Sequence, residues 1–120
     1  MAKQQNITIG GKTYPVTFTL QTIINFEETA KKSYFGLEYM TTLDRVALIY
    51  AAVTTAAPDA DIKIDAIIGK LDLEAAKEIM TNYATVNALA AEFFDVPAVM
   101  KEEEKTGKTE EPEADNDTKN

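Results

Sequence analysis

The sequence predicts an α+β, mainly α fold in which an N-terminal β-hairpin packs on a bundle of four to five helices and a disordered acidic C-terminal tail follows. Three observations predict it. Apolar and polar residues alternate on both sides of a Gly-Gly pair near the N-terminus, helical spacing follows, and the last twenty residues contain a single aliphatic residue and no aromatic one. We place the folded domain at residues 1–97 and the tail at residues 98–120.

The hairpin is predicted from alternation with a period of two residues. Ile7 and Ile9 alternate with polar residues before Gly10-Gly11, where glycine supplies the positive φ of a tight turn. The alternation resumes at Tyr14, Val16 and Phe18. Pro15 has no N–H to donate, so we expect its strand at an edge. Because an isolated hairpin is marginal in water, its apolar face should pack on helices.

The spacing becomes helical after the hairpin. Leu20, Ile23 and Ile24 fall on one face, Thr19 is suited to cap the helix start, and cations from Lys31 onward suit its end. Residues 33–40 (SYFGLEYM) have no clean period, and we interpret them as a connector that contains a short helical turn.

The second helix is predicted to be central. Residues 41–44 fit the Ser/Thr-x-x-acid pattern of a helix start, and residues 43–57 are apolar on almost every side. Pro58 ends this helix. A helix that is apolar on most faces belongs in the middle of a domain.

Two further helices are predicted before the tail. A short helix covers residues 62–71, capped by Asp61 or Asp65, and Asp72 caps a long helix over residues 73–93. The apolar stripe of the long helix consists of Ala76, Ile79, Met80, Tyr83, Val86, Asn87, Ala90 and Phe94.

The composition excludes several classes of function. The chain has no Cys and no His, so it lacks the residues for thiol nucleophiles, imidazole bases and the usual zinc or iron–sulfur sites. Its net charge of −8 is opposite to what a nucleic-acid reader needs. The absence of cysteine also rules out disulfides, which fits a reducing cytoplasm. No signal peptide and no apolar run of membrane length is visible.

The acidic residues do not predict an active site. Glu27 and Glu28 are adjacent, so on a helix they point about 100° apart and do not converge on one substrate. Asp59, Asp61 and Asp65 share part of the spacing of a calcium loop, but its fifth and sixth positions are a lysine and an isoleucine. We therefore expect a protein that is not an enzyme and has no cofactor or metal.

Two groups of apolar residues either close the core or contact a partner. One lies in the connector, and the other lies where the long helix ends and the tail begins. These candidate partner-binding residues are Tyr34, Phe35, Tyr39, Phe93, Phe94, Val96, Val99 and Met100. The open edge of the hairpin is a third candidate surface. The tail itself either maintains solubility or screens a binding surface.

The order of these features resembles a known family over roughly residues 6–95. A hairpin ITIGGKTYPVTFTL runs into a helix that ends NFEETAKKS, and TTLDRVALIYAAVTTAAPDADI, a short helix and a long helix follow. This resembles the tail assembly chaperones of long-tailed bacteriophages and related prophages. The resemblance implies a protein of the bacterial cytoplasm that binds the tape measure protein, helps recruit tail tube subunits and is absent from the finished particle. A chaperone of this kind is expected either to form a homo-oligomer or to bind long amphipathic helices. Many members of that family also make a longer product by ribosomal frameshifting.

Two other functions stay open. An acidic inhibitor that mimics DNA would bind a basic host protein through carboxylates spaced like phosphates. A structural tail or head-completion component would remain in the particle.

Overall fold

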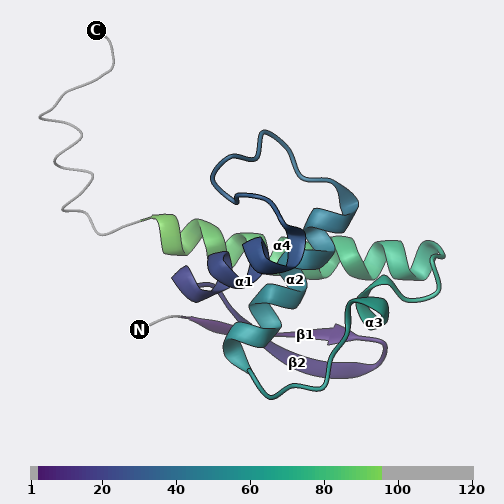
Figure 1. The fold of residues 1–120 in the computed structure, drawn as a ribbon. Coiled ribbons are helices and arrows are strands. Elements are labelled where there is room, and N and C mark those ends of the chain that lie inside the picture. The colour runs from purple at the N-terminus through teal and green to yellow at the C-terminus, as the bar shows by residue number, and fades with distance from the viewer. Residues whose placement is uncertain (1–2, 96–120) are drawn as a thin grey trace, which may run out of the picture.

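The computed structural model describes residues 3–95, which form a two-stranded antiparallel hairpin packed on four helices and so confirm the predicted fold class. The elements are β1 (Gln4–Ile9), β2 (Lys12–Thr17), α1 (Leu20–Ala30), α2 (Thr42–Ala56), α3 (Ile64–Ile68) and α4 (Leu73–Phe94), as shown in Figure 1. The predicted tail at residues 98–120 and the last two residues of the predicted domain lie outside the described residues.

The hairpin turn is the one that the two glycines predict. Gly10 and Gly11 have φ values of 58° and 85°, and they join the paired residues Ile9 and Lys12. Two successive positive φ values are typical of a type I′ turn, whose twist matches that of the strands.

Both edges of the hairpin are already engaged. The Asn82 side-chain amide of α4 donates to the Thr8 carbonyl oxygen of β1 at 2.8 Å. On β2, Pro15 has no N–H, and the Thr17 carbonyl oxygen accepts from the Thr22 hydroxyl at 3.2 Å. The prediction of an edge strand at Pro15 is confirmed, because β2 pairs with β1 alone.

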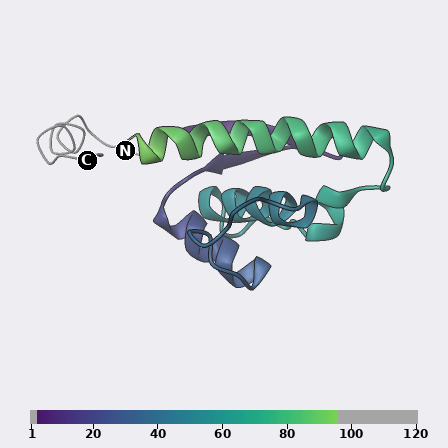
Figure 2. The same ribbon diagram turned by 90° about the horizontal axis from the view of Figure 1, so that it is seen from above.

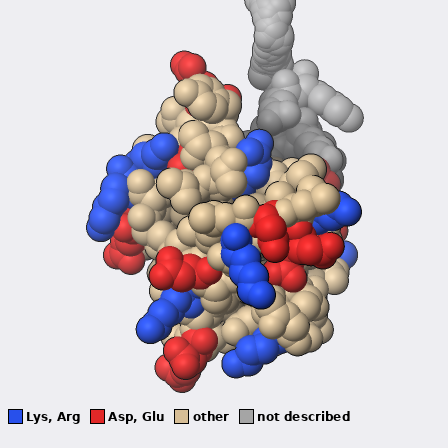
Figure 3. Space-filling model, turned by 90° about the vertical axis from the view of Figure 1, so that its right-hand side faces the viewer, with Lys and Arg blue, Asp and Glu red and all other residues tan. Residues whose placement is uncertain are grey.

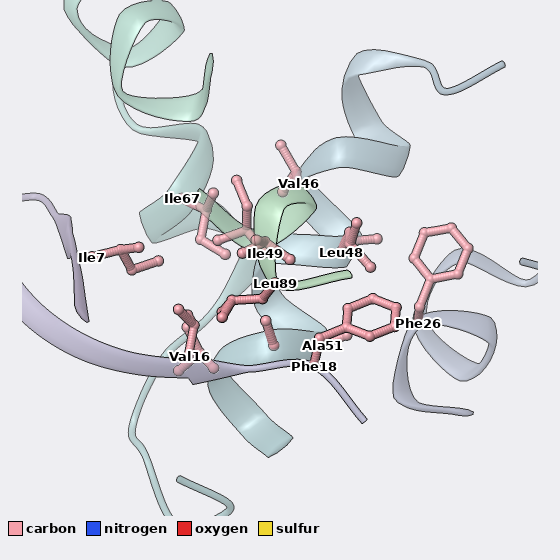
Figure 4. Close-up of a cluster of buried hydrophobic side chains, with 14 of the residues drawn as sticks. Ile7, Val16, Phe18, Phe26, Val46, Leu48, Ile49, Ala51, Ile67 and Leu89 are labelled. Carbon is pink, nitrogen blue, oxygen red and sulfur yellow. The ribbon is translucent and has the colours of Figure 1, made fainter. Parts of the chain in front are cut away.

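The helices and the hairpin are arranged with α2 in the middle. Seen from above, α4 and the hairpin lie on one side of α2, and α1 lies on the other (Figure 2). Side chains from the hairpin, α1, α3 and α4 converge on α2 in the core (Figure 4). The buried residues of α2 are Asp44, Val46, Ala47, Leu48, Ile49, Ala51, Ala52 and Val53. The predicted central helix is therefore confirmed.

The helix starts at Thr19, Thr41 and Asp72 are also confirmed. Thr19 and Thr41 both form reciprocal capping boxes, the first with Thr22 and the second with Asp44. The Asp72 carboxylate accepts from the Ala75 backbone N–H at 2.9 Å. Three of the four described helices thus begin where a side chain satisfies a free backbone N–H.

The predicted cap of α3 is wrong. Its N-cap residue is Lys63, which makes no side-chain cap hydrogen bond, so neither Asp61 nor Asp65 caps it. Asp65 lies inside the first turn instead, and Gly69, with φ 68° and ψ −141°, ends the helix early. The connector at residues 33–40 likewise contains no helix, only a turn in which the Leu37 N–H donates to the Tyr34 carbonyl oxygen at 3.3 Å.

The predicted stripe of α4 is partly wrong. Ile79, Val86 and Ala90 are buried as predicted, and Tyr83 is half-buried. The other four members of the predicted stripe are exposed: Ala76, Met80, Asn87 and Phe94. The buried side is instead completed by Asn82 and Leu89, because α4 rests on β1 and α2 along one flank only. Within residues 3–95, no helix has both the length and the apolar character that crossing a membrane requires.

Candidate protein-binding surface

The two candidate surfaces at the connector and at the end of the long helix meet in one aromatic cluster. We define the aromatic cluster as Phe18, Phe26, Tyr34, Phe35, Phe93 and Phe94. Phe18 follows β2, Phe26 belongs to α1, and the others come from the connector and from the last turn of α4. The connector and the end of α4 therefore form a single surface.

The inner part of the cluster belongs to the core. Phe18 and Phe26 are buried, and the Phe18 ring centroid lies 5.4 Å from that of Phe93 and 5.8 Å from that of Phe94. Tyr34 contacts both buried rings, at 5.9 Å from Phe18 and 5.7 Å from Phe26. Tilted and edge-to-face pairs of this kind contribute about 0.5–1.5 kcal/mol each beyond their burial. These contacts hold the outer rings in place.

The outer part of the cluster is open to solvent. Phe35 is 68% exposed, and its ring stands edge-on to Tyr34 at 5.5 Å and to Phe94 at 6.1 Å. Phe94 is 42% exposed and stacks on Tyr34, with centroids 6.2 Å apart and planes 13° from parallel. Tyr39, further along the connector, is 75% exposed. Phe93 is also exposed, at 39%, so the surface presents four large rings.

Hydrogen bonds fix the start of the connector. The Tyr34 backbone N–H donates to Glu27 Oε2 of α1 at 2.9 Å. Glu27 is half-buried, whereas the adjacent Glu28 is exposed. The Glu27 carboxylate thus satisfies the Tyr34 backbone N–H in a segment without regular structure. This hydrogen bond helps to hold the Tyr34 ring against the core.

The end of the connector is fixed by Asp44. This buried carboxylate accepts from the Thr41 backbone N–H at 3.0 Å, and its Oδ1 lies 3.2 Å from the Lys32 ammonium. Burial alone would raise the pKa of Asp44. Hydrogen bonds from the Thr41 backbone, the Lys32 ammonium and the Thr41 hydroxyl outweigh that effect and hold its pKa below the ordinary value of 3.8. Asp44 is therefore ionised at neutral pH and ties both ends of the connector together.

The rings surround an open groove of about 540 Å³. It is lined by Tyr34, Phe35, Leu37, Glu38, Tyr39, Met40, Tyr83, Asn87 and Phe94. Burial raises the pKa of the Tyr34 hydroxyl above its ordinary value of 10.0, and electrostatic repulsion from the nearby Tyr83 hydroxyl adds to the effect. The Arg45 guanidinium lies over the Tyr83 ring, 5.2 Å from its centroid. The groove is thus mainly aromatic, with a few polar groups at its rim.

Two other grooves are more polar. One runs between β1 and α4 past Glu74, Lys77 and Glu78, and the other lies between α1 and α2 beside Asn25 and Thr54. Among residues 3–95, no group of three or more acidic side chains is placed to hold a metal ion. The aromatic groove is therefore the strongest candidate site in this part of the chain.

Five of the eight predicted partner-binding residues lie in this surface. Tyr34, Phe35, Phe93 and Phe94 belong to the cluster, and Tyr39 lines the groove. Val96, Val99 and Met100 lie outside the described residues. Five further residues line the groove that the sequence did not indicate as members of the site: Leu37, Glu38, Met40, Tyr83 and Asn87. Tyr83 and Asn87 were assigned to the stripe of α4, and no sequence signal showed that the connector folds against them.

Comparison of this chain with protein-family models, with curated proteins and with solved structures finds no match.

Proposed function

We propose that this protein is a non-enzymatic tail assembly chaperone of a phage or prophage, which binds the tape measure protein in the cytoplasm of the bacterial host and helps recruit tail tube subunits. The observation that carries the proposal is the aromatic groove, in which Phe35, Tyr39 and Phe94 stand exposed around a pre-formed cleft. A tape measure protein is long, helical and prone to aggregate. Its amphipathic helices offer apolar side chains at intervals of three and four residues, and a groove of this kind accepts such side chains.

The rigidity of the exposed rings supports this function. Phe35 and Phe94 both contact Tyr34, and Tyr34 rests on the buried rings of Phe18 and Phe26. A partner helix therefore meets rings that are already ordered, and binding costs little side-chain entropy. Exposed aromatic side chains in a defined pocket are also the residues that dominate binding energy at protein interfaces.

The distribution of charge favours this proposal over the acidic inhibitor. Residues 3–95 carry eight Lys and Arg against twelve Asp and Glu. On the face seen in Figure 3, the two signs are interspersed rather than gathered into a continuous acidic surface. A DNA mimic depends on a one-signed field that salt screens, whereas binding in the aromatic groove should persist as salt concentration rises.

The proposal is tested by co-expressing the chain with the tape measure protein encoded beside it. We expect the tape measure protein to be recovered in a soluble complex that withstands high salt. Phe35→Asp should abolish recovery, because it places a charge among the rings that line the groove. Leu20→Asp is the matched control, since Leu20 is also an exposed apolar residue but lies at the start of α1, outside the groove.

Three results would contradict the proposal. In the first, the tape measure protein stays insoluble when it is co-expressed with the original chain. In the second, Phe35→Asp and Leu20→Asp reduce recovery of the soluble complex equally. Detection of the protein in purified particles would favour a structural component instead.

A further inference from the structure

The outward side of α4 is apolar where a surface helix normally carries charge. Ala84 lies two residues from both Asn82 and Val86, hence about 200° around the helix from these buried side chains. Along the same outward side, Leu73 is 67% exposed and Met80 is 69% exposed. The exposed outward residues of α4 are Leu73, Lys77, Met80, Ala84, Ala88 and Ala91. Lys77 is their only charged member.

From Lys77 onward, the spacing of these residues is symmetric about Ala84. The steps from residue 77 to 80, 84, 88 and 91 are three, four, four and three residues. Large side chains occupy the first half of the stripe and alanines occupy the second half. If a second α4 is laid across the first in the opposite direction with its centre at Ala84, Met80 faces Ala88 and Lys77 faces Ala91. Leu73 faces Asp95, at the end of the other helix.

We propose that two copies of this chain pair through the outward side of α4, antiparallel and about a two-fold axis at Ala84. Met80 of each copy packs against Ala88 of the other, and the Lys77 stem packs against Ala91. Such an interface is isologous, because the same surface serves both subunits. The alanines let the two helix backbones approach closely, as small residues do in other helix pairs.

The charges of α4 complement one another in this orientation. Lys77 is the only Lys or Arg among residues Leu73–Phe94, and it lies seven residues before Ala84. Glu92 lies eight residues after it, so antiparallel pairing brings the two together across the interface. Glu92 also contacts Lys3 at 3.3 Å, but both side chains are more than half exposed, and such a pair is weak. A parallel pair would place Lys77 beside Lys77, which is unfavourable.

This interface is separate from the aromatic groove. The groove meets α4 at Tyr83, Asn87 and Phe94, on the flank between the buried side and the outward side. The inference therefore does not depend on the proposed function, and each can fail alone. Phe35→Asp should leave the self-association unchanged, while Ala84→Glu should remove it.

Self-association is measured first by sedimentation equilibrium of the full chain. We expect a mass of twice 13.2 kDa at high concentration and a concentration-dependent decrease on dilution. Ala84→Glu places two like charges face to face at the axis, so it should raise the dissociation constant more than about tenfold. Circular dichroism checks that this exposed substitution leaves the fold intact. A mass of 13.2 kDa at every soluble concentration would overturn the proposal.

Cysteine cross-linking then tests the register, and the chain has no native cysteine to interfere. Under mild oxidation, Ala84→Cys should form a disulfide with its own copy across the axis. Ala88→Cys should not, because its two copies stand eight residues or about 12 Å apart along the helices, beyond disulfide reach. A mixture of Met80→Cys and Ala88→Cys should form the mixed disulfide. If Ala88→Cys cross-links with itself as readily as Ala84→Cys, the helices do not pair in this antiparallel register.

Discussion

Helices α2 and α4 are both rich in apolar residues but have different surroundings. Both carry apolar residues on most of their faces, and α2 is surrounded by the hairpin and the other helices. By contrast, α4 rests on β1 and α2 along one side, and no part of residues 3–95 covers Met80 and Leu73 on the other. An apolar face predicts that something covers it, but only the structure tells whether the covering element belongs to the same chain.

The strongest test of this difference is a cavity at the centre of α2. Ile49 is completely buried, so Ile49→Ala should lower the free energy of unfolding by about 3 kcal/mol, through lost burial and the cavity left behind. Urea unfolding followed by circular dichroism measures this loss. A change below about 1 kcal/mol would mean that α2 is not the central packing element.

The next largest effect concerns the buried start of α2. Asp44→Ala removes the carboxylate that accepts from the Thr41 N–H and pairs with Lys32. We expect a loss of about 2 kcal/mol, because a helix cap is removed and a backbone donor loses its partner. The same urea titration measures this loss of unfolding free energy. A loss no larger than that of Asp72→Ala, at an exposed cap residue, would show that burial of Asp44 adds nothing.

Acid should weaken the contribution of Asp44. Its pKa in the folded protein lies below the ordinary value of 3.8, so the ionised form stabilises the fold above that value. The contribution is lost as the pH falls through the folded pKa. Asp44→Asn keeps the shape without the charge, so the difference in stability between it and the original chain should be constant near neutral pH and narrow below 3.8. If the difference in unfolding free energy between the two proteins stays constant into strong acid, ionised Asp44 does not stabilise the fold.

A smaller effect is expected at the start of α4. Asp72 caps this helix by accepting from the Ala75 N–H, but it is exposed and has water as an alternative partner. Asp72→Ala should therefore cost about 1 kcal/mol, near the middle of the range for helix caps. Comparing it with Asp44→Ala in the same denaturant sets an exposed N-cap carboxylate against a buried carboxylate in the first turn that also pairs with Lys32. Equal losses would show that the two caps do not differ.

Local rules predicted much of the fold. Alternation about Gly10-Gly11 and capping residues at Thr19, Thr41 and Asp72 are properties of short segments, and all three helix starts and the hairpin are confirmed. The predicted cap of α3 was wrong, because several neighbouring aspartates give similar capping signals in the sequence. The observed N-cap residue is Lys63, which makes no side-chain cap hydrogen bond. The stripe of α4 was misplaced because both of its sides are apolar, and periodicity does not tell which side faces the core.

The sequence predicted many residues of the binding surface, but it did not predict that they lie together in one site. The aromatic residues of the connector and of α4 were identified from the sequence, yet they are about sixty positions apart. Their contact depends on the path of a connector without periodic structure, which is set by the Glu27 hydrogen bond to Tyr34 and by Asp44. Contacts of this kind depend on the whole fold, and a single sequence gives no local signal for them.

The smallest effect on the monomer is expected at Met80, the counterpart of Ile49 on the outward side of α4. Met80→Ala removes a side chain that is 69% exposed and introduces the best helix former, so at low protein concentration the free energy of unfolding should change by less than about 0.5 kcal/mol. At high concentration the original chain should gain stability through dimer formation, and the variant should gain less because Met80 packs against Ala88 of the second copy. Thermal unfolding across a hundredfold range of concentration measures both effects. A large loss at low concentration would mean that another part of the same chain covers Met80, and in that case the similarity between α2 and α4 would extend to their burial.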